Sequence, residues 1–86
     1  MGDFMRTILG IQVGDREHEA VRVQELLTKH GCYIKTRLGL HEASTINCSS
    51  KGLIILEFLP DTDKEVEAIE SELSSLESVT VRKMTF

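Results

Sequence analysis

Hydrophobic and polar residues alternate along the chain with two different spacings, and each change of spacing marks a new secondary-structure element. A spacing of two over Thr7–Val13 and Tyr33–Leu40 predicts half-buried β-strands. Leu53–Leu59 is apolar at almost every position, which is typical of a strand buried on both faces, and Pro60 ends it. Val79–Met84 alternates again and predicts a last strand.

Two further segments carry apolar residues at the spacing of three and four that gathers them on one side of a helix. The first is Arg16–Lys29, and Asp15 before it is predicted to be the N-cap residue. The second follows the sequence 62-TDKE-65, which predicts a capping box between Thr62 and Glu65. Its apolar positions are Val66, Ile69, Leu73 and Leu76.

The predicted order of elements is β-α-β-β-α-β. With right-handed crossovers, these elements form a four-stranded antiparallel sheet of order 4-1-3-2 with both helices on one face. This is the ferredoxin-like α+β arrangement, and its central strands are the first and the third, which are also the most apolar. We expect a single domain over residues 1–86, with a core from about residue 6 to residue 84.

Two helices cover only one face of such a sheet. The residues predicted to face the helices are Leu9, Ile11, Val13, Ile34, Leu38, Ile54, Leu56, Phe58, Val79 and Val81. The residues predicted for the open face are Ile8, Gly10, Gln12, Lys35, Arg37, Leu53, Ile55, Glu57, Thr80 and Arg82. Lys35 or Arg37 could pair across strands with Glu57.

The open face is too apolar for a purely solvated surface, so it predicts self-association into a dimer or tetramer. The predicted interface residues are Ile8, Gly10, Gln12, Lys35, Arg37, Ile55 and Glu57. The alternative is that Ile8 and Ile55 are simply exposed, as scattered apolar residues often are.

Charge and composition narrow the classes of partner. Fourteen acidic and ten basic residues give a net charge of −4, without the clustered Lys and Arg that neutralise phosphates, so we expect no binding to nucleic acid. No apolar run is long enough for a membrane span, and the N-terminus lacks the pattern of a signal peptide. Two cysteines are too few for a disulfide framework, and we expect a cytoplasmic protein with reduced thiols.

Two His–Cys pairs raise the question of a metal site: His30 with Cys32, and His41 with Cys48. The predicted strand between the pairs spans about 25 Å, so all four side chains cannot meet at one ion within a subunit. One hypothesis is a nickel or zinc sensor in which His41 and Cys48 are completed by ligands from another subunit. The alternative is that both are ordinary loop residues.

The sequence has no motif of a known catalytic site, and the carboxylates of Glu17 and Glu19 are expected to lie on a solvated helix face. We therefore expect no enzyme activity and no cofactor. The loop 13-VGDR-16 joins a central strand to a helix, where free amides could hold an anionic or zwitterionic ligand. The alternative is that Gly14 and Asp15 only make the turn and the cap.

The order and spacing of 13-VGDR-16, the amphipathic helix, 37-RLGL-40 and the apolar third strand resemble the small ACT-domain-like proteins of the iron-only hydrogenase system regulator family. The similarity covers about Arg6 to Lys83. It implies the same fold, homo-oligomerisation through the sheet and a regulatory, ligand-sensing role. The candidate ligand-binding residues are Gly14, Asp15, Arg16, Arg37 and Gly39.

Two departures from related patterns matter. Amino-acid-binding ACT domains have a glycine where this chain has His18, which puts amino-acid binding at that loop in doubt. The regulatory domain of the nickel-responsive repressor has a histidine where this chain has Gly39. The leading hypothesis is therefore a non-enzymatic regulatory module that responds to a small-molecule effector, and the alternatives are the metal sensor and a purely structural oligomerisation module.

Overall fold

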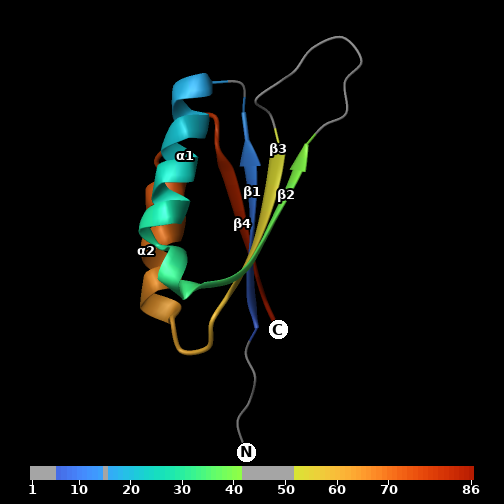
Figure 1. Cartoon of the computed structure of the whole chain (residues 1–86), viewed down its shortest axis with the longest axis vertical. Coiled ribbons are helices and arrows are strands. Elements are labelled where there is room, and N and C mark those ends of the chain that lie inside the picture. Colours follow the sequence, from blue (N-terminus) through green and yellow to red (C-terminus); the bar gives the residue numbers. More distant parts are fainter. Residues whose placement is uncertain (1–5, 15, 42–51) are drawn as a thin grey trace, which may run out of the picture.

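The structure is a computed structural model that describes residues 6–14, 16–41 and 52–86, without the side chain of His41. Its elements follow the predicted order (Figure 1). They are β1 (Thr7–Val13), α1 (Glu17–Lys29), a 3-10 turn η1 (Gly31–Tyr33), β2 (Ile34–His41), β3 (Gly52–Phe58), α2 (Asp63–Ser74) and β4 (Thr80–Thr85).

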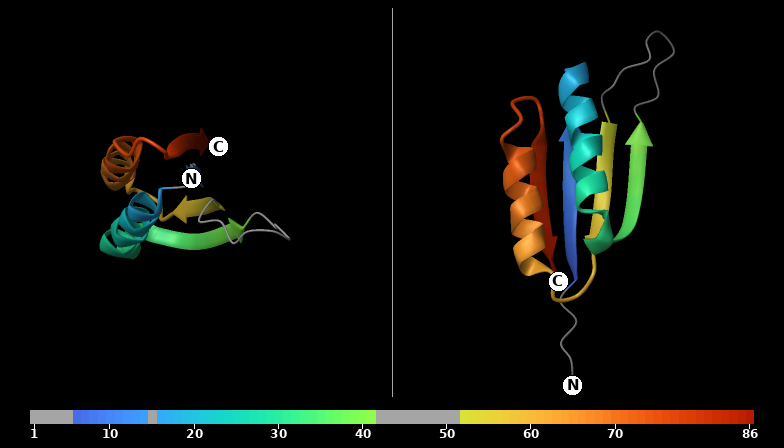
Figure 2. Two further views of the ribbon diagram at one scale, coloured as in Figure 1. Left: turned by 90° about the horizontal axis from the view of Figure 1, so that it is seen from above. Right: turned by 60° about the vertical axis from the view of Figure 1, so that its left-hand side comes forward.

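The four strands form one antiparallel sheet of order β2-β3-β1-β4, which confirms the predicted 4-1-3-2 order. Both helices lie on the same face of this sheet, as the views along and across the strands show (Figure 2). The chain therefore has a ferredoxin-like α+β fold, with β1 and β3 in the centre.

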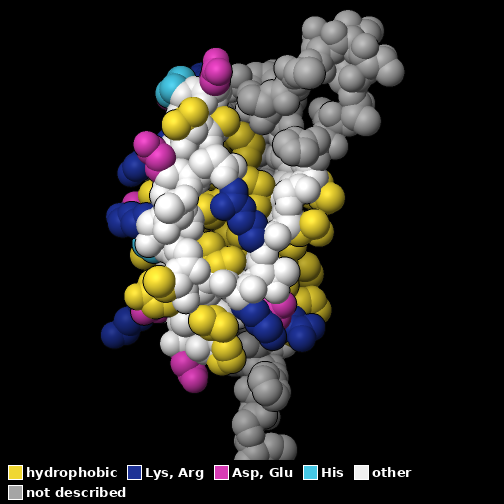
Figure 3. Space-filling view, viewed as in Figure 1, with side chains coloured by type: hydrophobic (Ala, Val, Ile, Leu, Met, Phe, Trp, Pro, Cys, Tyr) yellow, Lys and Arg dark blue, Asp and Glu magenta, His cyan; other side chains and the backbone are white. Residues whose placement is uncertain are grey.

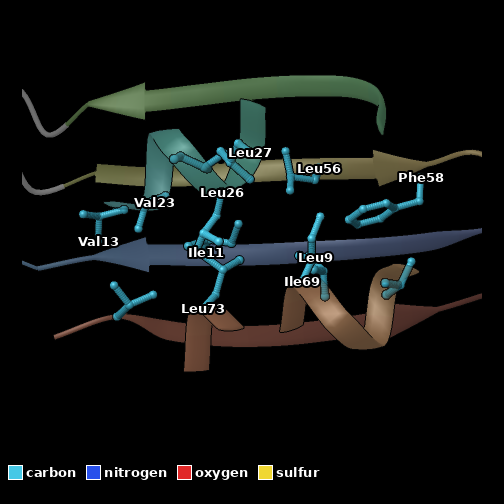
Figure 4. Packing of buried hydrophobic residues seen from close by; sticks show 13 residues of the cluster. Leu9, Ile11, Val13, Val23, Leu26, Leu27, Leu56, Phe58, Ile69 and Leu73 are labelled. Carbon is cyan, nitrogen blue, oxygen red and sulfur yellow. The ribbon is translucent and has the colours of Figure 1, made fainter. Parts of the chain in front are cut away.

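The core lies between the helices and the inner face of the sheet. Leu9 and Ile11 of β1 are fully buried, and they pack against Leu26, Ile69 and Leu73 of the two helices (Figure 4). Alternation along β1 explains this, because every second side chain of a strand points to the same face. The predicted inner positions of β1 and β3 are confirmed.

The face assignment of β2 is wrong at Leu38 and Arg37. The ladder between β2 and β3 shifts between Ile34 and Thr36, which marks a β-bulge with Lys35 as the extra residue. Beyond the bulge, Leu38 pairs with Ile55 and so lies on the open face, where it is 52% exposed. Arg37 pairs with the buried Leu56 and lies on the helix side.

The helix starts also differ from the predictions. Arg16, and not Asp15, is the N-cap of α1, and the Arg16 side chain makes no cap hydrogen bond. Thr62 is the N-cap of α2 as predicted, but its hydroxyl donates to the carbonyl of Leu59 at 2.7 Å and does not bond the helix amides. The predicted capping box is therefore wrong, because the preceding turn takes the hydroxyl.

Candidate functional site

The loop between β1 and α1, predicted to hold a ligand, packs against the turn that precedes β4. Gly14 lies so close to Ser78 that an added Cβ would be 2.6 Å from the Ser78 carbonyl oxygen. Arg16 forms an ion pair with Glu77 of the same turn. Asp15 lies outside the described residues. Gly14 and Arg16 thus contact Ser78 and Glu77, and these contacts hold the loop against the turn that precedes β4.

Glu19 fixes this turn from the side of α1. Its carboxylate accepts hydrogen bonds from the Ser78 hydroxyl, from the Ser78 amide at 2.9 Å and from the Glu77 amide at 3.1 Å. The Ser78 hydroxyl, followed by the Ser78 amide, lowers the pKa of the Glu19 carboxyl below its ordinary value. The prediction that Glu19 is solvated is wrong, because the side chain is buried.

A hollow of about 180 Å³ lies on the helix side of the sheet, between α1 and the paired ends of β2 and β3. Its lining residues are Val13, Ala20, Gln24, Arg37, Gly39, Leu40, Gly52, Leu53 and Ile54. Arg37 Nη2 donates to Gln24 Oε1, and a basic side chain crosses the gap between α1 and β2 in the space-filling view (Figure 3). Two of the five candidate ligand residues, Arg37 and Gly39, therefore share a concave surface.

His30 and Cys32 lie apart from this hollow, at the end of α1 and in η1. His30 Nε2 is 2.9 Å from Glu72 Oε1, and Lys29 Nζ is 3.4 Å from Glu72 Oε2. The hydrogen bond with His30, supported by Lys29, lowers the pKa of the Glu72 carboxyl. These contacts join the C-terminal end of α1 to α2.

The proposed metal ligands His41 and Cys48 fall on parts of the chain that the structure does not describe: the side chain of His41 and the whole of Cys48. Among the residues that are described, no group of three or more His, Cys, Asp and Glu side chains could hold a metal ion. The metal hypothesis for His41 and Cys48 stays a prediction.

The open face of the sheet can be described row by row from the strand registers. The rows, each read across β2, β3, β1 and β4, are Leu40–Leu53–Gln12–Thr80, Leu38–Ile55–Gly10–Arg82 and Thr36–Glu57–Ile8–Met84. We call Leu38, Leu40, Leu53 and Ile55 the apolar patch. Hydrophobic side chains run down the side of the molecule formed by β2 and β3 (Figure 3).

Of the predicted interface residues, Ile8, Gly10, Gln12, Ile55 and Glu57 lie on this open face. Arg37 does not, because of the bulge, and Lys35 is the bulged residue itself. The predicted pairing of Glu57 with Lys35 or Arg37 is also wrong: Arg6 Nε lies 2.9 Å from Glu57 Oε2.

The fold and the sites define a small ferredoxin-like domain with an open, partly apolar sheet face. The uncharacterized protein TM1266 from Thermotoga maritima is similar to it along almost all of both chains, with 26% identity, a TM-score of 0.78, and coverage of 96% of this chain and 99% of that one.

Two more distant structures share the fold alone. CPII from Thiomonas intermedia K12, a nitrogen regulatory PII-like protein bound to ADP, AMP and bicarbonate, has 14% identity, a TM-score of 0.57, and coverage of 96% and 91%. A dimeric ferredoxin-like protein of unknown function from Thermobifida fusca has 8% identity, a TM-score of 0.51, and coverage of 100% and 95%. No protein-family model and no curated protein matches the chain. In the described part of the chain, no helix is long and apolar enough to cross a membrane.

Sequence reasoning missed Glu19 and the hollow for different reasons. Glu19 follows two other polar residues at the start of a helix, and nothing in the sequence tells which of them turns toward the β4 turn. The hollow depends on the bulge at Lys35, which reverses the faces of β2. The glycine of 37-RLGL-40 was a usable signal, since Gly39 leaves space where a side chain would stand.

Proposed function

We propose that this chain is a non-enzymatic regulatory domain that senses a small-molecule effector and works as a homo-oligomer, as the iron-only hydrogenase system regulators that it resembles are expected to do. Two copies would associate through the open faces of their sheets. The observation that carries this proposal is the apolar patch, and the regulatory PII-like and dimeric ferredoxin-like proteins of the same fold are consistent with it.

The apolar patch is contiguous and exposed, and it lies on the open face of the sheet. Leu38, Leu40 and Leu53 are 52%, 47% and 39% exposed, and with Ile55 they form two adjacent cross-strand pairs. Contiguous exposed apolar surface on a small domain marks an interaction site more often than scattered residues do. Its position on a sheet face, where a second copy can pack with the same patch, favours a two-fold symmetric contact.

Polar residues flank this patch on the side of β1 and β4, as they do at the rim of protein interfaces. Gln12 and Thr80 continue the row of Leu40 and Leu53, and Arg82 continues the row of Leu38 and Ile55. Gly10, between Ile55 and Arg82, keeps the middle of the face low, so a side chain from a second copy could rest there. This layout supports association between two copies through an interface whose centre excludes water and whose rim stays accessible to solvent.

Sedimentation at tens of micromolar tests the oligomer. We expect the wild type to sediment as a dimer or tetramer and Leu38→Glu to sediment as a monomer, because a carboxylate in the patch would be buried without a partner. Val21→Glu is the matched control: Val21 is 55% exposed on α1, on the other side of the molecule from the open face, and this variant should keep the wild-type mass. A monomeric wild type would refute the proposal.

A thermal-shift screen with amino acids and related metabolites tests the sensing role, because a ligand of the folded state raises its apparent stability by RT ln(1 + [L]/Kd). A reproducible, saturable shift supports the role of sensor. An oligomer that responds to no compound would leave a purely structural oligomerisation module as the better description.

A further inference from the structure

The hollow between α1 and the β2–β3 end has the features of a small binding site. It opens on the helix side of the sheet, at the end of β2 and β3 where Leu40 and Leu53 of the apolar patch also contribute to its lining. Ala20 and Gln24, one turn apart on α1, form one wall, and Arg37 and Gly39, two residues apart on β2, form the opposite wall.

The β-bulge creates this space. By reversing the faces of β2, it puts Arg37 and Gly39 on the helix side, where a regular strand would have placed Leu38 and Leu40. A Cβ added to Gly39 would meet no atom of the described residues within 4 Å, so this side of β2 is not covered by α1. Bulges of this kind are known to re-aim side chains next to binding sites.

The charge of the hollow indicates what it would bind. Of the described residues that line it, Arg37 is the one that carries a charge. Among the described residues, Arg6, Arg16 and Arg22 each form an ion pair with a carboxylate, whereas Arg37 bonds the neutral amide oxygen of Gln24. A guanidinium has five N–H donors in a fork that fits a carboxylate, so Arg37 keeps donors for an anionic ligand.

The walls and the volume limit the rest of the ligand. Val13, Ala20 and Ile54 provide apolar surface, which suits a short aliphatic chain. Among the described residues that line the hollow there is no Asp or Glu, so these residues offer no carboxylate to an ammonium group. A volume of about 180 Å³ is below the roughly 300–1,000 Å³ of pockets for drug-sized ligands, which is too little for a nucleotide.

We propose that this hollow binds a small aliphatic carboxylic acid without an amino group, such as a branched 2-oxo acid, through an ion pair between its carboxylate and Arg37. This inference rests on the sensing role proposed above and names the chemical class of the effector. Gln24 would position the guanidinium, and its amide nitrogen could donate to the ligand once the ligand takes over the contact with Arg37.

The probes are 4-methyl-2-oxopentanoate and leucine, which differ at the 2-position, where an oxo group replaces the ammonium. We expect calorimetric titration to show binding of the oxo acid to the wild-type oligomer and at least tenfold weaker binding of leucine. Arg37→Gln should weaken the binding of the oxo acid at least tenfold. Arg22→Gln, which removes an arginine on the solvent side of α1, should leave its affinity unchanged.

A second pair of variants tests the site by filling the hollow without changing its charge. Gly39→Leu fills the hollow and should abolish binding, while Gly31→Leu adds the same side chain at another glycine with open space around its Cβ and should not. Sedimentation of Gly39→Leu shows whether the oligomer is kept. Loss of binding with the oligomer intact supports the site.

Three outcomes overturn the inference. They are an oligomeric wild type that binds no branched 2-oxo acid, binding that persists in Arg37→Gln or Gly39→Leu, and leucine binding equal to that of the oxo acid. None of these outcomes contradicts the proposed oligomer. The last two are still consistent with a sensing role that uses a different site or ligand. A monomeric wild type that binds the oxo acid would refute the oligomer and support the hollow.

Discussion

Gly14→Ala should destabilise the protein strongly although it adds one methyl group. The new Cβ would lie 2.6 Å from the Ser78 carbonyl oxygen and 2.7 Å from the Ser78 Cβ, where carbon atoms normally approach to about 3.5–4.0 Å. Ser78 cannot easily move away, because its amide and its hydroxyl both bond the buried Glu19 carboxylate. The clash therefore has to be relieved by a shift of the backbone.

Overpacking of this kind costs about 1–3 kcal/mol, and we expect the upper half of that range because one contact is with backbone. For a domain of this size, about 2–3 kcal/mol lowers the melting temperature by roughly 10–20 °C. Urea unfolding followed by circular dichroism measures the loss as a lower midpoint at an unchanged slope.

Gly39→Ala is the matched control for Gly14→Ala. No described glycine has a positive φ, so neither substitution strains the backbone, and the Cβ at Gly39 meets nothing within 4 Å. We expect its free energy of unfolding to be unchanged or raised by up to about 1 kcal/mol. If Gly14→Ala unfolds within about 0.5 kcal/mol of the wild type, or if both variants lose the same amount, the packing of Gly14 against Ser78 is not what limits this position.

Three further predictions concern the acid stability, the core and the bulge. Because the folded pKa of Glu19 is below its ordinary value, its contribution to stability is complete at neutral pH and is lost as pH falls through the lowered pKa. The urea midpoint of Glu19→Gln should therefore depend less on pH than that of the wild type between about pH 5 and pH 2. An equally steep dependence would contradict this. Leu9→Ala should lower the free energy of unfolding by about 2–5 kcal/mol in urea, because Leu9 is fully buried. Leu59→Ala, at a 41% exposed position, should lower it by less than about 1 kcal/mol. Similar losses in the two variants would argue against the assigned core. Deletion of Lys35 should remove the bulge and keep the register beyond it. A cysteine placed at Leu38, in dilute monomeric protein whose Cys32 and Cys48 are replaced by serine, should therefore react with a thiol reagent equally fast with and without the deletion. Protection in the deletion variant alone would show that the strand has slipped.

The sequence was sufficient to predict the strand order and the core, because spacing of two and of three to four marks each element and the central strands are the most apolar. The faces of β2 could not be predicted in the same way. The open face is itself apolar around Ile55 and Leu53, so Leu38 has hydrophobic neighbours on that face as well as on the other. Hydrophobicity alone does not decide between them, and the bulge has no clear signal in 34-IKTRLGL-40.

The roles of single polar residues at the candidate sites were less predictable. Glu19 and Thr62 both bond groups in turns next to their helices, whereas the patterns around them predicted a solvated carboxylate and a capping box. The Glu19 contact depends on how a turn elsewhere in the chain approaches the helix, and the Thr62 contact depends on the local turn that begins at Leu59. By contrast, Arg37 and Gly39 could be selected from the motif that carries the resemblance, and the structure places both at the hollow.

The central position of β1 has a consequence for how the chain folds. β1 lies between β3 and β4, and its first residue, Thr7, pairs with Thr85. During synthesis, one edge of β1 therefore stays without its partner until β4 has left the ribosome. Contacts between such distant segments slow folding, because a long loop must close before they form. β1, the first of the four strands to be made, is thus among the last to be fully paired, and until then its apolar side chains depend on β3 and the helices for protection from aggregation.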